Sequence, residues 1–542
     1  MRLHAIQCQI IMRSYLSTRI LPPFLTCLLL FGLLISGGCI ENSGPGPKDG
    51  QSAVDCDFST ITGTPIYAHA SWGILVVDPQ TDEVLYERNA DEMFVPASTT
   101  KLFTSAAVLE SLGPDYRFIT PVYAIGTVDR TGILEGDLVL VASGDPDIGG
   151  RMLPDGSIEF TNVDHGDANA LGGAILTATD PLAGLDSLAL QVRATGITEV
   201  SDVVIDDRLF ETTDLGKGFV VSPIIVNDNL VDVIITPGAV GTAPSLAMRP
   251  QTAAYRLVNE AVTGPAGNPL GITITDGAGE TIVVRGCVAA DAGRVNQTYS
   301  VKTPASYART LFIEALARHG VHVGAPATGE NPSEKLPETG TYADAKEVAR
   351  ITSPPLTEDV KLTLKVSQNL HADTYISLIA AASNKTGFYD GLIKEGEILR
   401  SMDIDTAAVS LGDGEGGVEE DRFSPRSAAQ LLTIVTTRPY SEEFTEALPV
   451  LGVDGSLASS CTAGNPARGY VYAKTGTHGT YDPLNDRGIL LTKSLAGYVD
   501  TASGKRLIFA VFVNNVPFLD VQDMYTVGED LGSIAGLIYT HY

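Results

Sequence analysis

The chain is poor in cysteine and in basic residues for its length. Six cysteines in 542 residues are too sparse for a disulfide-built scaffold, and the sequence has neither a cysteine pattern with metal-ligand spacing nor an H-E-x-x-H motif. Lysine and arginine number 36 against 65 aspartates and glutamates, which gives a net charge of −29. A surface of that sign repels phosphate backbones and argues against nucleic acid as a partner. We therefore expect a protein without metal or cofactor.

The first residues carry an export pattern. Basic residues precede an apolar run from Leu21 to Ile35, and three small residues follow it. This order is typical of a signal within residues 1–39. Cys39, directly after the small residues, resembles a lipobox cysteine and is a candidate for lipidation; a cleaved signal or a plain membrane anchor is the alternative. We expect an exported protein, in the periplasm or at the extracellular face of the cell membrane.

A tether and few thiols follow the signal. Residues 40–56 are rich in glycine, proline and serine, which predicts a flexible connection between membrane and domain. Three cysteines remain in the exported part, namely Cys56, Cys287 and Cys461. Outside the cytoplasm they permit one disulfide, and the sequence does not choose the pair.

The remaining chain contains segments with helical patterns and segments with short β-type runs. GILVVD and EVLYER, on either side of PQTD, predict a β-hairpin, and residues 96–113 predict a helix that stops at Gly113. Residues 121–299 hold short β-type runs divided by turn residues, without a comparably long helical pattern. Helical patterns return after residue 300, and GYVYAKTGT, SLAGYVD and RLIFAVFVNN predict three strands before an amphipathic last helix.

This order predicts an α+β fold. Strands from both ends of the chain would form one antiparallel sheet with helices packed on it. Under this interpretation residues 57–120 and 300–542 form the main domain. Residues 121–299 form one or more β-rich inserted domains.

The first candidate motif is Ser98-x-x-Lys101 in the predicted helix. A helix N-terminus favours developing negative charge through its unpaired N–H groups and its dipole. A residue three positions on lies over the same face, so the Lys101 amine can reach the Ser98 hydroxyl. A buried amine loses its charge readily and can act as a base. Alone the motif is weak, because a helix cap followed by a solvated lysine has the same letters.

Two further motifs supply partners for this pair. Ser367 and Asn369 can aim a hydroxyl and an amide from one helix junction into one cleft, for proton relay and for holding a peptide carbonyl. Lys474-Thr475-Gly476-Thr477 ends a predicted strand, where a lysine and two hydroxyls suit a free carboxylate and the glycine lets a substrate approach. Each alone also fits a turn or a solvated strand end. In this order, S-x-x-K, S-x-N and K-T-G are the signature of penicillin-binding proteins and class A β-lactamases.

With these motifs, residues 70–520 resemble the class C low-molecular-mass penicillin-binding proteins, which are D-alanyl-D-alanine carboxypeptidase/endopeptidases. The resemblance extends to VPASTTKL, GPDYRF, GDLVLVASGDP, NLHAD, LPVLGVDGSL and SLAGYV. The long insert after the first motif separates this family from the compact β-lactamases. The resemblance implies a serine β-lactamase/DD-peptidase-like domain with an inserted domain, and it implies peptidoglycan stem peptides and β-lactams as ligands.

The resemblance also implies a role for each motif residue. Ser98 would be the acylated nucleophile and Lys101 its base, while Ser367 would pass the proton to the leaving D-alanine. The substrate-binding residues would be Asn369 for the amide and Lys474, Thr475, Gly476 and Thr477 around the terminal carboxylate. Main-chain N–H groups of Ser98 and Thr477 would form the oxyanion hole.

The sequence departs from the family pattern at three places. Gln368 stands where the family usually has aspartate, and Glu415, within DGEGGV, stands where it has serine. A longer loop, HGTYDPLNDRGILLTK, separates the third motif from SLAGYV. His371 and His478 lie near motifs and are expected to be structural or solvated rather than catalytic.

Two other functions stay open on the sequence. A β-lactamase or esterase on the same scaffold would turn penicillin over instead of keeping a lasting adduct. A non-catalytic wall-binding lipoprotein would bind wall peptides without cleaving them, and only the altered DGEGGV segment favours it. The sequence leaves open the stem peptide, the balance of carboxypeptidase to endopeptidase, and the oligomeric state.

Overall fold

The structure is a computed structural model that describes residues 57–338 and 341–542. The predicted signal and tether, with Cys39 and Cys56, lie outside the described residues. Within residues 57–338 and 341–542, no helix is long and apolar enough to cross a membrane. Cys287 and Cys461 are both free thiols, so these two do not form a disulfide with each other.

The main domain is organised by a five-stranded antiparallel sheet from both ends of the chain, as the sequence predicts. Its strand order is β18–β19–β20–β1–β2. The strands are β1 (Ser71–Asp78), β2 (Glu83–Arg88), β18 (Val471–Asp482), β19 (Arg487–Asp500) and β20 (Arg506–Phe518). The long loop predicted after the third motif is instead the end of the β18–β19 hairpin, because pairing continues from Thr477↔Lys493 to Asp482↔Arg487.

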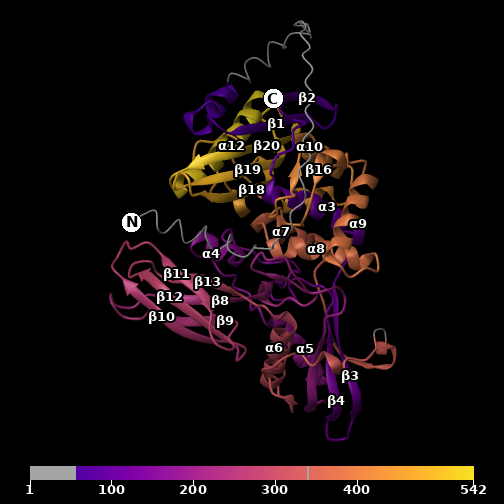
Figure 1. The fold of residues 1–542 in the computed structure, drawn as a ribbon. Coiled ribbons are helices and arrows are strands. Elements are labelled where there is room, and N and C mark those ends of the chain that lie inside the picture. Colours follow the sequence, from indigo (N-terminus) through magenta and orange to yellow (C-terminus); the bar gives the residue numbers. More distant parts are fainter. Residues whose placement is uncertain (1–56, 339–340) are drawn as a thin grey trace, which may run out of the picture.

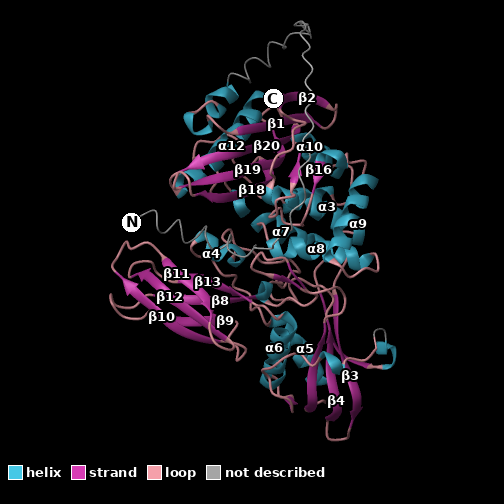
Figure 2. Cartoon of the chain, in the orientation of Figure 1, coloured by secondary structure: helices cyan, strands magenta, loops and turns pink. Residues whose placement is uncertain are grey.

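Both faces of this sheet are covered by helices (Figure 2). Strand β20 is buried on both sides: Ile508, Ala510 and Phe512 belong to one hydrophobic cluster, whereas Phe509 and Val511 belong to another. This division follows from the alternation of side chains along a strand. Helix α12 (Val521–His541) covers the second face, together with the first described helical turns at residues 57–67.

A helical cluster covers the other face. Its central element is α3 (Lys101–Leu112), which contacts α7, α8, α9 and α10 and is buried from Lys101 to Leu109. The surrounding helices are α7 (Leu356–Val366), α8 (Asn369–Ala382), α9 (Phe388–Ser401), α10 (Pro425–Val435) and α11 (Ser441–Ala447). A short strand pair, β16 (Val409–Ser410) and β17 (Arg422–Phe423), brackets the DGEGGV segment. The first and second motifs therefore meet inside one packed cluster.

The insert lies at the other end of the molecule (Figure 1) and holds three larger sheets besides the two-stranded pair of β6 (Thr213–Asp214) and β7 (Val220–Val221). One has the strand order β14–β5–β4–β3–β15, with β3 (Ile119–Val128), β4 (Ile133–Val141), β5 (Glu199–Asp206), β14 (His322–Val323) and β15 (Lys346–Thr352). The second has the order β13–β8–β9, with β8 (Leu230–Thr236), β9 (Ser245–Arg249) and β13 (Val295–Ser300). The third has the order β10–β12–β11, with β10 (Arg256–Gly264), β11 (Gly271–Asp276) and β12 (Thr281–Ala289).

Three elements of the insert differ from the sequence prediction. Helix α5 (Ala183–Ala194) lies in the stretch predicted to be β-rich, with Leu185, Leu188 and Val192 buried along one face. Helix α6 (Pro304–Arg318) was placed in the main domain but packs on α5 and β5, and β15 pairs with β3. The insert therefore continues beyond residue 299. An apolar stripe identifies a helix but not the surface that it will cover.

Candidate active site

The nucleophile candidate sits in a tight turn that leads into α3. Ser98 belongs to a short 3-10 helix, η2 (Ala97–Thr100), and α3 begins directly after it at Lys101. Ala97 has φ +47°, in the left-handed region that costs a non-glycine residue about 1 kcal/mol. The Lys101 Nζ lies 2.9 Å from the Ser98 Oγ, so the predicted pair is formed.

Lys101 is fully buried among neutral oxygen acceptors. Its Nζ donates to the Asn369 Oδ1 at 2.8 Å and to the main-chain oxygen of Glu415 at 2.9 Å. Burial lowers the pKa of the Lys101 ammonium, and the negative charges of Glu415 and Asp413 oppose that shift. A lysine in this environment gives up its proton more easily than one in water.

The second motif occupies the junction of α7 and α8, as predicted. Ser367 has φ +64° and ends α7, while Asn369 begins α8. This reversal brings the Ser367 hydroxyl to Lys474 at 3.0 Å and the Asn369 amide oxygen to Lys101 at 2.8 Å. Between them, the Gln368 side chain accepts a hydrogen bond from the Leu370 N–H at 2.9 Å and caps α8.

Lys474 of β18 completes the cluster. Its Nζ donates to the Ser367 Oγ at 3.0 Å and to the main-chain oxygen of Thr475 at 2.8 Å. Burial, and then the nearby positive charge of Lys101, hold the pKa of Lys474 well below its ordinary value. The structure thus brings both lysines and both serines of the three motifs together.

Gly476 is needed where β18 passes the nucleophile turn. A Cβ at this position would lie 2.3 Å from the Pro96 carbonyl oxygen and 3.3 Å from the Ser98 nitrogen. Any larger residue would therefore push β18 away from the Ser98 turn. The threonines on either side have other contacts: the Thr475 Oγ1 meets the Ser456 Oγ at 2.7 Å, and the exposed Thr477 accepts a hydrogen bond from Lys493 at 2.9 Å.

The insert contributes two charged residues that sequence reasoning missed. Lys217, in the loop between β6 (Thr213–Asp214) and β7 (Val220–Val221), pairs with Asp373 at 2.7 Å, Asp413 at 2.6 Å and Glu415 at 3.4 Å. Asp167 lies close enough to both motif lysines for its charge to raise their pKa values. The sequence signal for Lys217 is slight, a lone cation between Gly216 and Gly218.

A second buried cluster lies behind Gln368 and is centred on Asp228. This carboxylate accepts hydrogen bonds from Arg151 at 2.6 Å, His165 at 2.7 Å, Gln368 at 3.0 Å and His371 at 3.1 Å. Asp228 comes from the insert, whereas His371 belongs to α8 and Gln368 caps it. The cluster therefore joins the insert to the helix that carries Asn369.

The two histidines of this cluster are each held between carboxylates. His165 also meets Asp232 at 2.7 Å, and His371 meets Asp359 at 2.9 Å. Burial alone would lower the pKa values of both histidines. The neighbouring carboxylates outweigh burial and raise the pKa of each histidine to about 10. His371 thus joins α8 to Asp359 of α7 and to Asp228 of the insert, and its non-catalytic role stays a prediction.

One set of the described residues has the geometry of a metal site, namely Asp164, His165 and Asp228. The Arg151 guanidinium lies among their ligand atoms, 2.8 Å from Asp164 and 2.6 Å from Asp228. Its positive charge already occupies the position that a metal ion would take.

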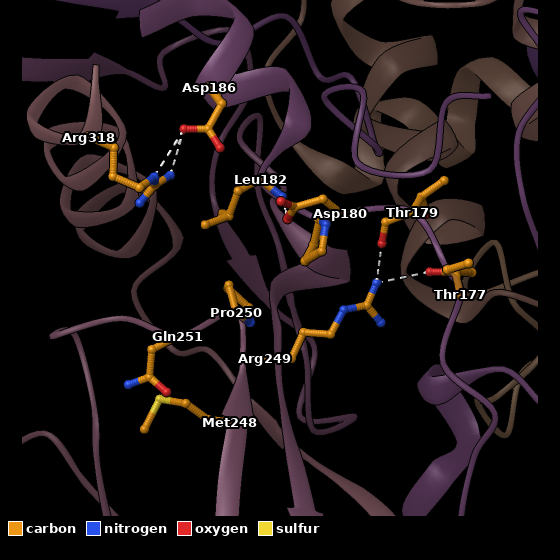
Figure 3. A pocket seen from close by; sticks show the side chains of 12 residues that line it. Thr177, Thr179, Asp180, Leu182, Asp186, Met248, Arg249, Pro250, Gln251 and Arg318 are labelled. Atoms are coloured by element: carbon orange, nitrogen blue, oxygen red, sulfur yellow. Dashed lines mark hydrogen bonds and ion pairs between the residues drawn. The ribbon is translucent and has the colours of Figure 1, made fainter. Parts of the chain in front are cut away.

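A cavity of about 590 Å³ lies in the insert (Figure 3). The start of α5 and the end of β9 form its walls, and Arg249 reaches across it to Thr177 and Thr179. The Asp186–Arg318 ion pair closes another side. None of the predicted motif residues lines this cavity.

The chain matches the D-Ala-D-Ala carboxypeptidase 3 (S13) family over residues 57–532. It is also 32% identical over 485 residues to the D-alanyl-D-alanine carboxypeptidase of Actinomadura sp. (strain R39), covering 85% of this chain and 80% of that protein. The chain belongs to this carboxypeptidase family. It is a serine-type carboxypeptidase of the penicillin-binding class that acts on peptidoglycan.

Solved structures share the fold of the carboxypeptidase. The crystal structure of penicillin-binding protein 4 (DacB) from Haemophilus influenzae has a TM-score of 0.67 at 20% identity, covering 89% of this chain and 98% of that one. The same protein in complex with a β-lactam has a TM-score of 0.65 at 19% identity, covering 89% and 99%. The predicted α+β fold of the serine β-lactamase/DD-peptidase type is thereby confirmed.

Proposed function

We propose that the carboxypeptidase is an exported enzyme that cleaves D-Ala-D-Ala stem peptides, and cross-links of the same chemistry, through an acyl-enzyme on Ser98. The Lys101 Nζ carries this proposal, because it contacts the Ser98 Oγ and the Asn369 Oδ1 together, at 2.9 and 2.8 Å. A nucleophile and its base are thus in contact with the residue assigned to the substrate amide. The β-lactam complex of the Haemophilus protein supports penicillin as a second ligand.

The acylation step uses the first two motifs. Neutral Lys101 takes the proton from the Ser98 hydroxyl as the oxygen attacks the carbonyl of the penultimate D-alanine. Main-chain N–H groups of Ser98 and Thr477 stabilise the oxyanion. Ser367, held by Lys474 at 3.0 Å, relays the proton now on Lys101 to the departing amine, and the C–N bond breaks. Water then attacks the ester and frees Ser98.

The third motif holds the end of the substrate. Lys474, Thr475 and Thr477 bind the carboxylate of the leaving residue, and Gly476 leaves room between β18 and the Ser98 turn. Burial lowers the pKa of Lys474, and a bound carboxylate raises it again, because an opposite charge favours the protonated amine. Substrate binding and charging of Lys474 are therefore coupled.

Two further assignments belong to this proposal. The peptidase domain comprises the main sheet and its helices, and the insert supplies Asp167 and Lys217 to the rim of the site. Export places the enzyme outside the cytoplasm, where peptidoglycan stems are found, and Cys39 is the proposed lipid anchor. Mass spectrometry of the mature N-terminus tests the anchor, which a protein that begins elsewhere than Cys39 would rule out.

Labelling with a fluorescent penicillin tests the acyl-enzyme. We expect a lasting adduct on Ser98 in the purified protein and none in Ser98→Ala. Ser105→Ala is the matched control, because Ser105 lies on the same helix with a buried hydroxyl that has no hydrogen-bond partner among the described residues. It should label like the wild type.

Other outcomes point to the competing functions. Rapid release of hydrolysed penicillin would make the protein a β-lactamase or esterase. Neither adduct nor turnover would refute the catalytic proposal and would favour a wall-binding lipoprotein.

A further inference from the structure

Lys493 lies next to the third motif on the neighbouring strand. It is paired directly with Thr477 in the antiparallel register of β18 and β19, so the two side chains share one face of the sheet. The Lys493 Nζ donates to the Thr477 Oγ1 at 2.9 Å. Residues on adjacent strands thereby bring an ammonium to the hydroxyl assigned to the substrate carboxylate.

This ammonium has no carboxylate partner in the described chain. The comparable cations do: Lys217 has three, and Lys365 pairs with Asp454 at 2.7 Å. Lys493 is only partly exposed, because Gly528 of α12 lies against the end of its side chain. A half-buried cation without an anion gains a charge-assisted hydrogen bond when a ligand carboxylate arrives.

We propose that Lys493 is a specificity-determining residue that selects substrates with a free carboxylate on the leaving residue over the corresponding amides or esters. This inference rests on the proposed function and deepens it. Lys493 acts by its charge and through Thr477, since a hydroxyl that accepts from Lys493 turns its own proton toward the ligand. The ligand class is a peptide or β-lactam that carries a carboxylate beside the scissile bond.

The two lysines at this end of the site differ in their surroundings. Lys474 is fully buried beside Lys101, and its pKa is held well below the ordinary value. Burial also lowers the pKa of Lys493, but only to about 8, so this ammonium is largely charged at pH 7. Lys493 therefore adds a positive charge at the carboxylate end of the site, in contact with Thr477.

Paired substrates test the proposal. The probes are an N-acetylated L-Lys-D-Ala-D-Ala peptide and the same peptide with a C-terminal carboxamide. We expect Lys493→Met to raise KM for the acid by about tenfold, as for loss of a charged hydrogen bond, with kcat little changed. KM for the carboxamide should stay constant. Lys493→Arg should keep the preference for the acid, and Lys505→Met, at an exposed lysine of the β19–β20 turn, is the matched control.

A second readout is independent of peptide turnover. Acylation by benzylpenicillin and by its uncharged methyl ester should differ in the wild type and in Lys493→Arg, and the difference should shrink in Lys493→Met. Equal losses on acid and carboxamide would show a packing role and overturn the proposal. A wild type that labels at Ser98 but does not prefer the acid would overturn it and leave the proposed function intact. A wild type inert toward penicillin and peptide would refute both.

Discussion

Two clusters of buried ionisable groups meet at the start of α8, and burial has opposite consequences in them. In the active site, Lys101 and Lys474 donate to hydroxyl, amide and main-chain oxygens, and burial lowers the pKa of each. In the cluster around Asp228, His165 and His371 each bridge two carboxylates, and the pKa of each is raised to about 10. The first cluster keeps its bases reactive, and the second keeps its cations charged.

The difference between the two clusters shows which surroundings suit catalysis and which suit anchoring. A buried cation with a matched anion is held as a charge and joins elements together, whereas a buried amine among neutral acceptors is ready to exchange its proton. The two clusters touch through the second motif, since Gln368 donates to Asp228 at 3.0 Å while its neighbour Asn369 accepts from Lys101. The matched cluster thus holds the helix on which the reactive one depends.

The largest effect is expected from removing the charge of Asp228, the carboxylate at the centre of the second cluster. Asp228→Asn leaves Arg151 and two imidazolium groups without their shared carboxylate, deep inside the protein. We expect the free energy of unfolding to fall by about 3–5 kcal/mol, the usual cost of breaking a buried pair. Chemical denaturation measures this, with Asp115→Asn, at an exposed position, as the control. Equal midpoints for the two variants would show that the cluster does not anchor the fold.

The pH dependence of stability sharpens the same prediction. The histidine pKa values are raised from 6.5 to about 10 in the folded state, so their stabilising contribution is complete below pH 6.5. It is lost as the pH rises toward 10. The wild type should therefore lose stability between these values, and Asp228→Asn should show a weaker dependence. A wild-type stability that rises across this interval would contradict the assignment.

The contrast also explains which parts of the site could be predicted from the sequence. The three motifs can be recognised in the sequence, because each joins a helix start, a helix junction or a strand to chemistry that local spacing reveals. Asp228 and Lys217 could not be predicted from the sequence, because no local pattern marks long-range contacts. Asp228 contacts Gln368 across 140 residues, and Lys217 contacts Asp373 across 156 residues. Helix α6 was recognised but placed in the wrong domain, since periodicity reports a buried face and not its partner. Charge matching between distant segments was the missing information.

A smaller effect is expected from removing the charge of Lys217, which should make Lys101 in the active site hold its proton more strongly. Lys217 offsets Asp373, Asp413 and Glu415, all of which raise the pKa of Lys101. In Lys217→Met these charges are uncompensated, so the pKa of Lys101 should rise and less of it should be neutral at pH 7. We expect the rate of penicillin acylation at pH 7 to fall, by at most about tenfold for each unit by which this pKa rises, and to recover at higher pH.

Two lysine variants separate charge from structure in that experiment. Lys217→Arg keeps the cation and should keep the pH profile. Lys385→Met, an exposed lysine after α8, should behave like the wild type. A Lys217→Met protein whose acylation is equally slow at every pH would show that Lys217 positions the loop and does not tune Lys101.

The smallest effect is expected from Glu415→Gln, which should lower the pKa of Lys101, whereas Lys217→Met should raise it. Glu415 is the largest of the charges that raise the pKa of Lys101, while its main-chain oxygen accepts the Lys101 hydrogen bond. The amide removes the charge and keeps that acceptor, so the pH profile of acylation should move to lower pH, by less than about 1 on the pH scale. Because Lys217 and Glu415 lie 3.4 Å apart, their effects should not add. In the double variant Glu415→Gln should shift the profile more than it does in the wild type, because without Lys217 the Glu415 charge is uncompensated. Strict additivity would mean that the two residues act on Lys101 independently.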